Sequence, residues 1–101
     1  MPPNFQGVMA EQNRCEIKAR VLDIIQDSNF KDKWNIELEI LEMKNLSGPT
    51  FVNVGDKVKG FAFEATPHFT PYRLTSGSLI TVEAEFIGDE RGGKFRLHKF
   101  L

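Results

Sequence analysis

With 101 residues, the chain is long enough for one domain and too short for two. Hydrophobic residues make up 41% and charged residues 27%, as in an ordinary soluble globular domain. The net charge is −1, so the strongly basic footprint that usually marks a nucleic-acid-binding protein is absent from the chain as a whole. Cys15 is the only cysteine, which excludes an internal disulfide and a cysteine zinc cluster.

The N-terminal residues 1–14 show no periodicity and are predicted to form a flexible arm, followed by a single domain over residues 15–101. The start of the chain has neither the basic nor the apolar region of a signal peptide. No apolar run approaches the roughly 20 residues that span a bilayer. We therefore expect an intracellular, cytoplasmic protein without membrane contact.

Alternating apolar residues predict a first strand over residues 15–26 and a second from Trp34 to about residue 43. In the first, the alternation changes phase after Val21, which predicts a bulge or bend near Leu22 and Asp23. The second contains residue types that favour helix, but the strict alternation from Ile36 to Ile40 favours a strand. Turn-forming residues separate the two strands.

A third strand is predicted within residues 51–63, followed by a short helix over residues 71–76. Thr70 suits the N-cap of that helix, and Pro71 suits its first position. The C-terminal part reads as a hairpin, because residues 80–86 and 95–97 both alternate. Gly92 and Gly93 lie between them and supply the positive φ that tight turns require.

Five strands with a short helix between the third and fourth resemble the OB-fold, an all-β, five-stranded Greek-key barrel. The features that carry the resemblance are the bend between Ile17 and Ile25, the helix and Gly77 before the fourth strand, and the final hairpin that ends near Leu97. The resemblance covers about residues 14–101. Within this range the chain is similar to OB domains of the single-strand nucleic-acid-binding type, as in replication protein A and single-strand binding proteins.

In such domains the ligand lies on strands 2 and 3 and on the loops that join strands 1–2 and 4–5. Single-strand binders combine aromatic platforms with cations that follow the phosphates. The aromatic and cationic residues that this resemblance gathers on one face are Phe30, Lys31, Lys33, Trp34, Lys57, Lys59, Phe61, Phe63, Arg91, Lys94 and Arg96. Stacking is expected from Trp34, Phe61 and Phe63. Phosphate contacts are expected from Lys31, Lys33, Lys57, Lys59, Arg91 and Lys94.

Each assignment has a plainer alternative. Trp34 shares its parity with Ile36 and would equally cap the core. A bulge at Gly60 would turn Phe61 and Phe63 into the barrel. The loop cations could be ordinary solvated charges, and the outward face of the second strand also carries glutamates, which repel phosphate.

The sequence therefore predicts a module that binds single-stranded nucleic acid with little sequence preference, DNA rather than RNA, in replication or repair. The alternative is a protein-interaction module within a larger protein or complex, docking through the loop around His68, Phe69 and Tyr72. No catalysis is expected, because His68 and His98 lie on different elements and no phosphate-binding glycine loop is present. We expect neither a metal nor another cofactor.

Overall fold

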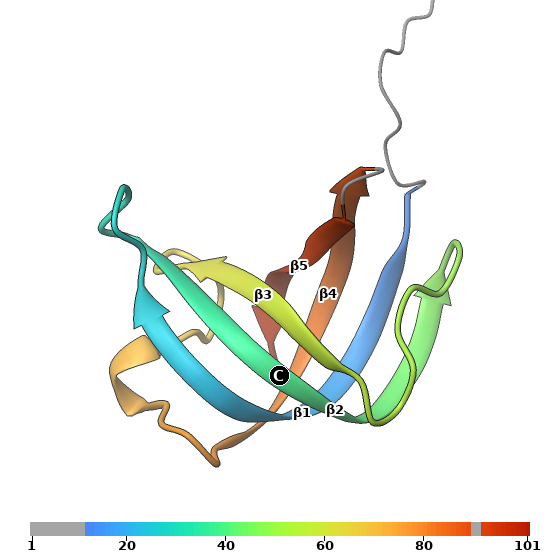
Figure 1. The fold of residues 1–101 in the computed structure, drawn as a ribbon, viewed down its shortest axis with the longest axis horizontal. Coiled ribbons are helices and arrows are strands. Elements are labelled where there is room, and N and C mark those ends of the chain that lie inside the picture. The colour runs from blue at the N-terminus through green and yellow to red at the C-terminus, as the bar shows by residue number, and fades with distance from the viewer. Residues whose placement is uncertain (1–11, 90–91) are drawn as a thin grey trace, which may run out of the picture.

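The computed structural model describes residues 12–89 and 92–101, which form an all-β barrel (Figure 1). Its strands and its one short helix are β1 Arg14–Gln26, β2 Lys33–Ser47, β3 Lys57–Phe63, the 3₁₀ turn η1 Pro71–Arg73, β4 Leu79–Asp89 and β5 Gly92–Phe100. The strands close in the order β1-β2-β3-β5-β4, with β4 paired again to β1. The predicted all-β, five-stranded barrel, with a short helix between β3 and β4, is thus confirmed.

The long first strand bends where the sequence predicted. Val21 pairs with Leu38 and Asp23 pairs with Glu37, so the register shifts across Leu22. The same bend is held from the other side by the turn before β4. The amide of Gly77 donates to the carbonyl of Val21 at 2.7 Å, and φ at Gly77 is +98°. Glycine tolerates this value, whereas a side chain would strain it.

The core lies inside the barrel and follows the predicted alternation. Ile17, Val21 and Leu38 are fully buried, and Phe95 and Leu97 close the interior from β5. Residues of opposite parity on these strands face outward. Burial of alternate residues from every strand is what fixes the register, because a slip by one residue would expose the whole apolar set.

β3 closes the barrel against β5 in parallel, through two residue pairs within the described chain, Gly60 with Phe95 and Phe61 with Arg96. Gly60 is buried, and a Cβ there would lie 3.2 Å from the carbonyl oxygen of Phe95. The glycine therefore allows the two backbones to approach closely. The pairing of β3 with β2 runs from Lys33 to Glu39 without a register shift, so no bulge forms at Gly60.

The predicted hairpin of β4 and β5 is confirmed, but Gly93 is required for a different reason from the one predicted. φ is positive at Gly48, Gly55 and Gly77, and Gly93 instead lies within β5. A Cβ on Gly93 would lie 2.4 Å from the carbonyl oxygen of Ile87. Gly93 is therefore needed for close approach of the two strands rather than for a left-handed turn.

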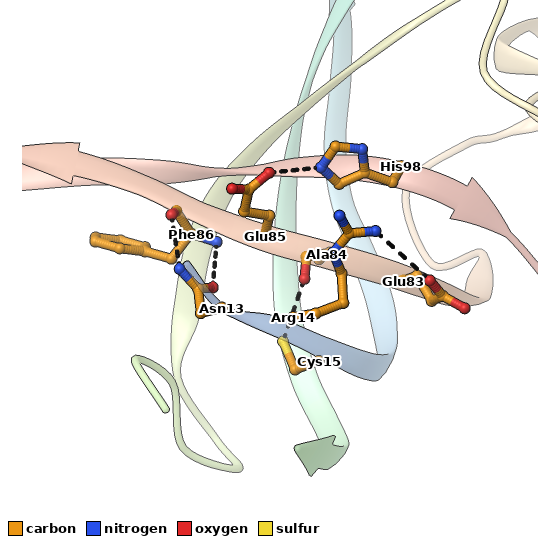
Figure 2. A network of polar contacts seen from close by, with 8 residues as sticks. All are labelled: Asn13, Arg14, Cys15, Glu83, Ala84, Glu85, Phe86 and His98. Carbon is orange, nitrogen blue, oxygen red and sulfur yellow. Dashed lines mark hydrogen bonds and ion pairs between the residues drawn. The ribbon is translucent and has the colours of Figure 1, made fainter. Parts of the chain in front are cut away.

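The residue before β1 is held against β4, as Figure 2 shows. The side-chain amide of Asn13 donates to the carbonyl of Phe86 at 3.1 Å, and the amide of Phe86 donates to Asn13 Oδ1 at 2.8 Å. Asn13 is 6% exposed, so its side chain substitutes for a strand backbone at this point. The ordered barrel thus includes the end of the predicted arm; the rest of that arm, residues 1–11, lies outside the described residues.

The predicted helix is shorter than expected. It covers only Pro71–Arg73, and Thr70 occupies the N-cap position without a capping hydrogen bond from its side chain. β2 is longer than predicted, because Arg14 and Cys15 pair with Ser47 and Asn45 and extend the ladder. In the described ranges, no helix is long and apolar enough to cross a membrane.

Candidate functional site

Two phenylalanines stand on the outer face of β3. Gly60 and Ala62 are buried, so the residues between and after them, Phe61 and Phe63, face away from the core and are half-buried. Their ring centroids are 5.9 Å apart, with the ring planes at 90°. The outward orientation expected from unbroken alternation is therefore the one that the structure adopts, and the inward alternative is not.

Three cations from the neighbouring strands surround this aromatic pair. Lys33 Nζ on β2 lies 4.8 Å from the centroid of Phe61, and Lys94 Nζ on β5 lies 5.9 Å from it. The guanidinium carbon of Arg96 lies 5.6 Å from the centroid of Phe63. Within the described part of the chain, none of the three forms an ion pair with a carboxylate. Their charge is thus not neutralised by direct contact, although, after the hydrogen bond from Asn35, the charge of Lys33 helps to lower the pKa of Asp27. An exposed cation–π contact of about 0.5–1 kcal/mol is weak enough to be displaced by a ligand.

A groove of about 400 Å³ crosses the strands beside Phe61. Its lining comes from β1, the β1–β2 loop, β2, β3 and β5, and consists of Asp23, Ile25, Asp27, Asn35, Ile36, Glu37, Lys59, Gly60 and Lys94. Asn35 lies directly opposite Phe61 across the β2–β3 ladder. The groove and the aromatic pair therefore form one continuous surface, with rings and cations on one side and carboxylates on the other.

The loop between β1 and β2 is organised by Asp27. Its carboxylate accepts hydrogen bonds from Asn35 Nδ2 at 2.9 Å and from the amides of Asn29 at 2.9 Å and Phe30 at 3.1 Å. The bond from Asn35, followed by the one from Asn29, lowers the pKa of Asp27 below its ordinary value. Phe30 is 58% exposed at the loop tip, and Lys31 beside it is also exposed.

Trp34 lies in the core, so its burial favours the plainer interpretation over the predicted stacking role. It is 9% exposed, and its Nε1 donates to Glu64 Oε2 at 3.0 Å. The exposed ring of Tyr72 packs edge-on against it, with centroids 5.1 Å apart. Trp34 therefore offers little ring surface to a base, and we leave it out of the proposed interface.

The remaining predicted cations occupy different places. Lys59 lines the groove opposite Glu37, while Lys57 lies opposite Glu39. Glu39 is itself paired with Arg20 at 2.9 Å. Lys57 is four residues from Phe61, about 13 Å along the strand, so it belongs to the periphery of the site. The predicted phosphate contact at Arg91 lies outside the described residues.

Sequence reasoning missed the polar side of the groove. Asp27 lies among the turn-forming residues between the first two strands, and Asn35 lies on the outward face of the second strand; neither position alone predicts a ligand site. The outward parity of Asn35 beside Glu37 was a usable signal, because both lie on the same face as Phe61. The hydrogen bond between Asn35 and Asp27 joins residues eight positions apart and depends on how the loop folds back, which periodicity does not report.

Other chemistry finds little support in the described residues. They hold no group of three or more histidine, cysteine, aspartate or glutamate side chains that could bind a metal. Cys15 is buried, and burial raises the pKa of its thiol, an effect that Arg14 opposes. A thiol with a raised pKa is a poor nucleophile.

No family model, curated protein or solved structure matches the chain, so its function is inferred from the geometry of the outer face of β2, β3 and β5.

Proposed function

We propose that this barrel binds single-stranded nucleic acid on the outer face of β2, β3 and β5, without catalysis. The observation that carries the proposal is the pair of half-exposed rings, Phe61 and Phe63, flanked by Lys33, Lys94 and Arg96 within 6 Å. Aromatic platforms beside unpaired cations are the arrangement that single-strand binders use.

The expected energies suit such a ligand. A base stacked on an aromatic side chain contributes roughly 1–3 kcal/mol, so two rings provide useful affinity before any phosphate contact. The net charge of −1 does not oppose this, because the cations are concentrated around the rings. Phosphates lying over Lys33, Lys94 and Arg96 would place bases on Phe61 and Phe63.

The strand order supports the same class of ligand. The barrel closes as β1-β2-β3-β5-β4, and the candidate face includes β2 and β3, where OB-folds bind oligonucleotides. We therefore extend the resemblance to replication protein A and single-strand binding proteins from fold to function, with DNA favoured over RNA and an intracellular role in replication or repair.

The decisive experiment is a titration of fluorescein-labelled oligo-dT and oligo-U, followed by anisotropy at two salt concentrations. We expect saturable binding that weakens as salt is raised. The double variant Phe61→Ala/Phe63→Ala should lose at least tenfold in affinity, from the loss of two stacking contacts. Phe51→Ala is the matched control, because the Phe51 ring is 41% exposed but stacks on Phe86.

A protein-interaction module is the second candidate, favoured by Tyr72, which is 79% exposed on the turn before β4. Its neighbour Phe69 does not share that exposure, since it is buried and stacks on Phe100 at 4.8 Å. The predicted aromatic docking loop is therefore reduced to Tyr72 and His68. Absence of oligonucleotide binding by the wild-type protein at either salt concentration would favour this second function.

A further inference from the structure

The groove beside Phe61 has a chemistry of its own. Three carboxylates and two ammonium groups line it, so it disfavours phosphate while it favours groups that donate hydrogen bonds. The adjacent rings and cations have the opposite preference, and Lys94 lies at the boundary because it lines the groove and also contacts the Phe61 ring. A single-stranded ligand has both kinds of group, phosphates on its backbone and donors on its base edges.

Within the described chain, Glu37 is the groove carboxylate with no hydrogen bond to either oxygen, whereas Asp27 and Asp23 each accept at least one. The oxygens of Asp27 already accept from Asn35, Asn29 and Phe30, and Asp23 Oδ1 accepts from the amide of Ile24 at 3.0 Å. Among the described residues, Glu37 forms neither an ion pair nor a hydrogen bond through its side chain, although Lys59 lies opposite it.

Glu37 is exposed and lies between an opposite charge, Lys59 on β3, with which it forms no ion pair, and a like charge on β1. It lies directly opposite Asp23 on β1, and both side chains line the groove. Like charges at opposed positions of a strand pair destabilise the sheet. Glu39, the next outward residue of β2, shows the usual solution, because it is paired with Arg20 at 2.9 Å. The arrangement at Glu37 therefore suits a ligand that brings its own donors.

We infer that this groove is a guanine-selective subsite, an inference that rests on the proposed function. Guanine carries two adjacent donors, N1–H and the N2 amino group, which match the two oxygens of the Glu37 carboxylate. Asn35 donates one amide hydrogen to Asp27 and keeps a second, which would donate to guanine O6. The base would stack on Phe61, the ring directly opposite Asn35.

The other bases satisfy this groove less well. Thymine and uracil have one ring N–H between two carbonyl oxygens, and those oxygens would face the carboxylate. Cytosine and adenine each present one amino group beside an acceptor nitrogen. Guanine alone pairs two donors with one carboxylate, so the face has a single base-selective position within an otherwise unselective strand path. A bidentate contact of this kind gives about tenfold discrimination.

Competition by three oligonucleotides of equal length tests the inference: all-thymidine, the same strand with one central deoxyguanosine, and the same strand with one central deoxyinosine. Inosine keeps N1–H and lacks the N2 amino group. The wild-type protein should bind the guanosine strand about tenfold more tightly than the all-thymidine strand, and inosine should lose most of that gain.

The matched variants are Glu37→Gln and Glu39→Gln, which remove the same charge from neighbouring outward positions of β2. Glu37→Gln should abolish the guanine preference and bind all-thymidine at least as tightly as wild type. Glu39→Gln should keep the preference.

If wild type binds all three strands equally while Phe61→Ala weakens them all, the subsite is refuted and the proposed function stands. If Glu37→Gln keeps the preference, the role of Glu37 is refuted. If no strand binds, both proposals fail.

Discussion

Lys33 Nζ lies 4.8 Å from the centroid of the Phe61 ring, although the two residues are not directly opposite in the β2–β3 ladder. Lys33 is paired with Phe63, and Asn35 is paired with Phe61, so the lysine reaches diagonally across the sheet. This diagonal contact brings a positive charge to the ring, and a stacked base would displace the ammonium group towards its own phosphate. It links the aromatic and the electrostatic parts of the proposed interface.

The first prediction concerns salt. Replacing Lys33 or Lys94 with Gln removes one phosphate contact, so the slope of log affinity against log salt should fall by about 0.7 for each. Fluorescence anisotropy with oligo-dT over a series of salt concentrations measures the slope. Lys18→Gln is the control, because Lys18 is paired with Glu42 on β2 and lies outside the proposed interface. An unchanged slope in both lysine variants would contradict the assignment.

Trp34→Phe separates a core role from a stacking role. The smaller ring loses the hydrogen bond to Glu64 and part of the packing against Tyr72. We expect the free energy of unfolding to fall by about 1–3 kcal/mol, measured by urea denaturation. Oligonucleotide affinity should stay within twofold of wild type. A large loss of affinity with unchanged stability would restore the stacking role.

Gly93→Ala tests the close approach of β4 and β5. The added Cβ would lie 2.4 Å from the Ile87 carbonyl oxygen and 2.7 Å from the Cα of Gly88, so the backbone must shift. We expect a loss of about 1–3 kcal/mol, with amide chemical shifts changing around Phe86 and Ile87. Gly77→Ala meets no atom within 4 Å but has φ of +98°, so its shifts should change beside Val21 instead.

Asp27 should make stability depend on pH. Its pKa is lowered by the hydrogen bonds from Asn35 and Asn29, so the ionised form is favoured in the folded state. The stabilisation is complete above the pKa of the unfolded chain and is lost as the pH falls through the lower folded pKa. Urea denaturation of wild type and Asp27→Asn should show a stability difference at neutral pH that shrinks in acid. A constant difference would mean that the carboxylate charge is not the cause.

Sequence periodicity predicted the parts of the molecule that depend on burial. The alternation of Ile17, Ala19 and Val21 placed the core, and the break after Val21 placed the bend. Parity also placed Phe61 and Phe63 on the outer face, given that no bulge formed at Gly60. These features follow from which side of a strand meets water, and residue type reports that directly.

Features that depend on contacts between distant segments were not predictable in this way. The alternation of β2 is compatible with Trp34 as a core residue and as a stacking platform. Its ring is covered by Tyr72 and Glu64, which come from distant segments of the chain. The need for glycine at position 93 depends on how closely β4 and β5 pack. The polar wall of the groove requires the β1–β2 loop to fold back onto Asn35, which no local pattern encodes.

The junction of β3 with β5 has a consequence for motion. Within the described residues, only two residue pairs join these strands, whereas β3 pairs with β2 along its whole length. The β3–β5 pairing is therefore the less extensive of the two, and it includes Phe61 and Arg96. Backbone amides of this pairing should exchange with deuterated solvent sooner than those of β1. An oligonucleotide that contacts both Phe61 on β3 and Lys94 on β5 would hold the two strands together and slow that exchange.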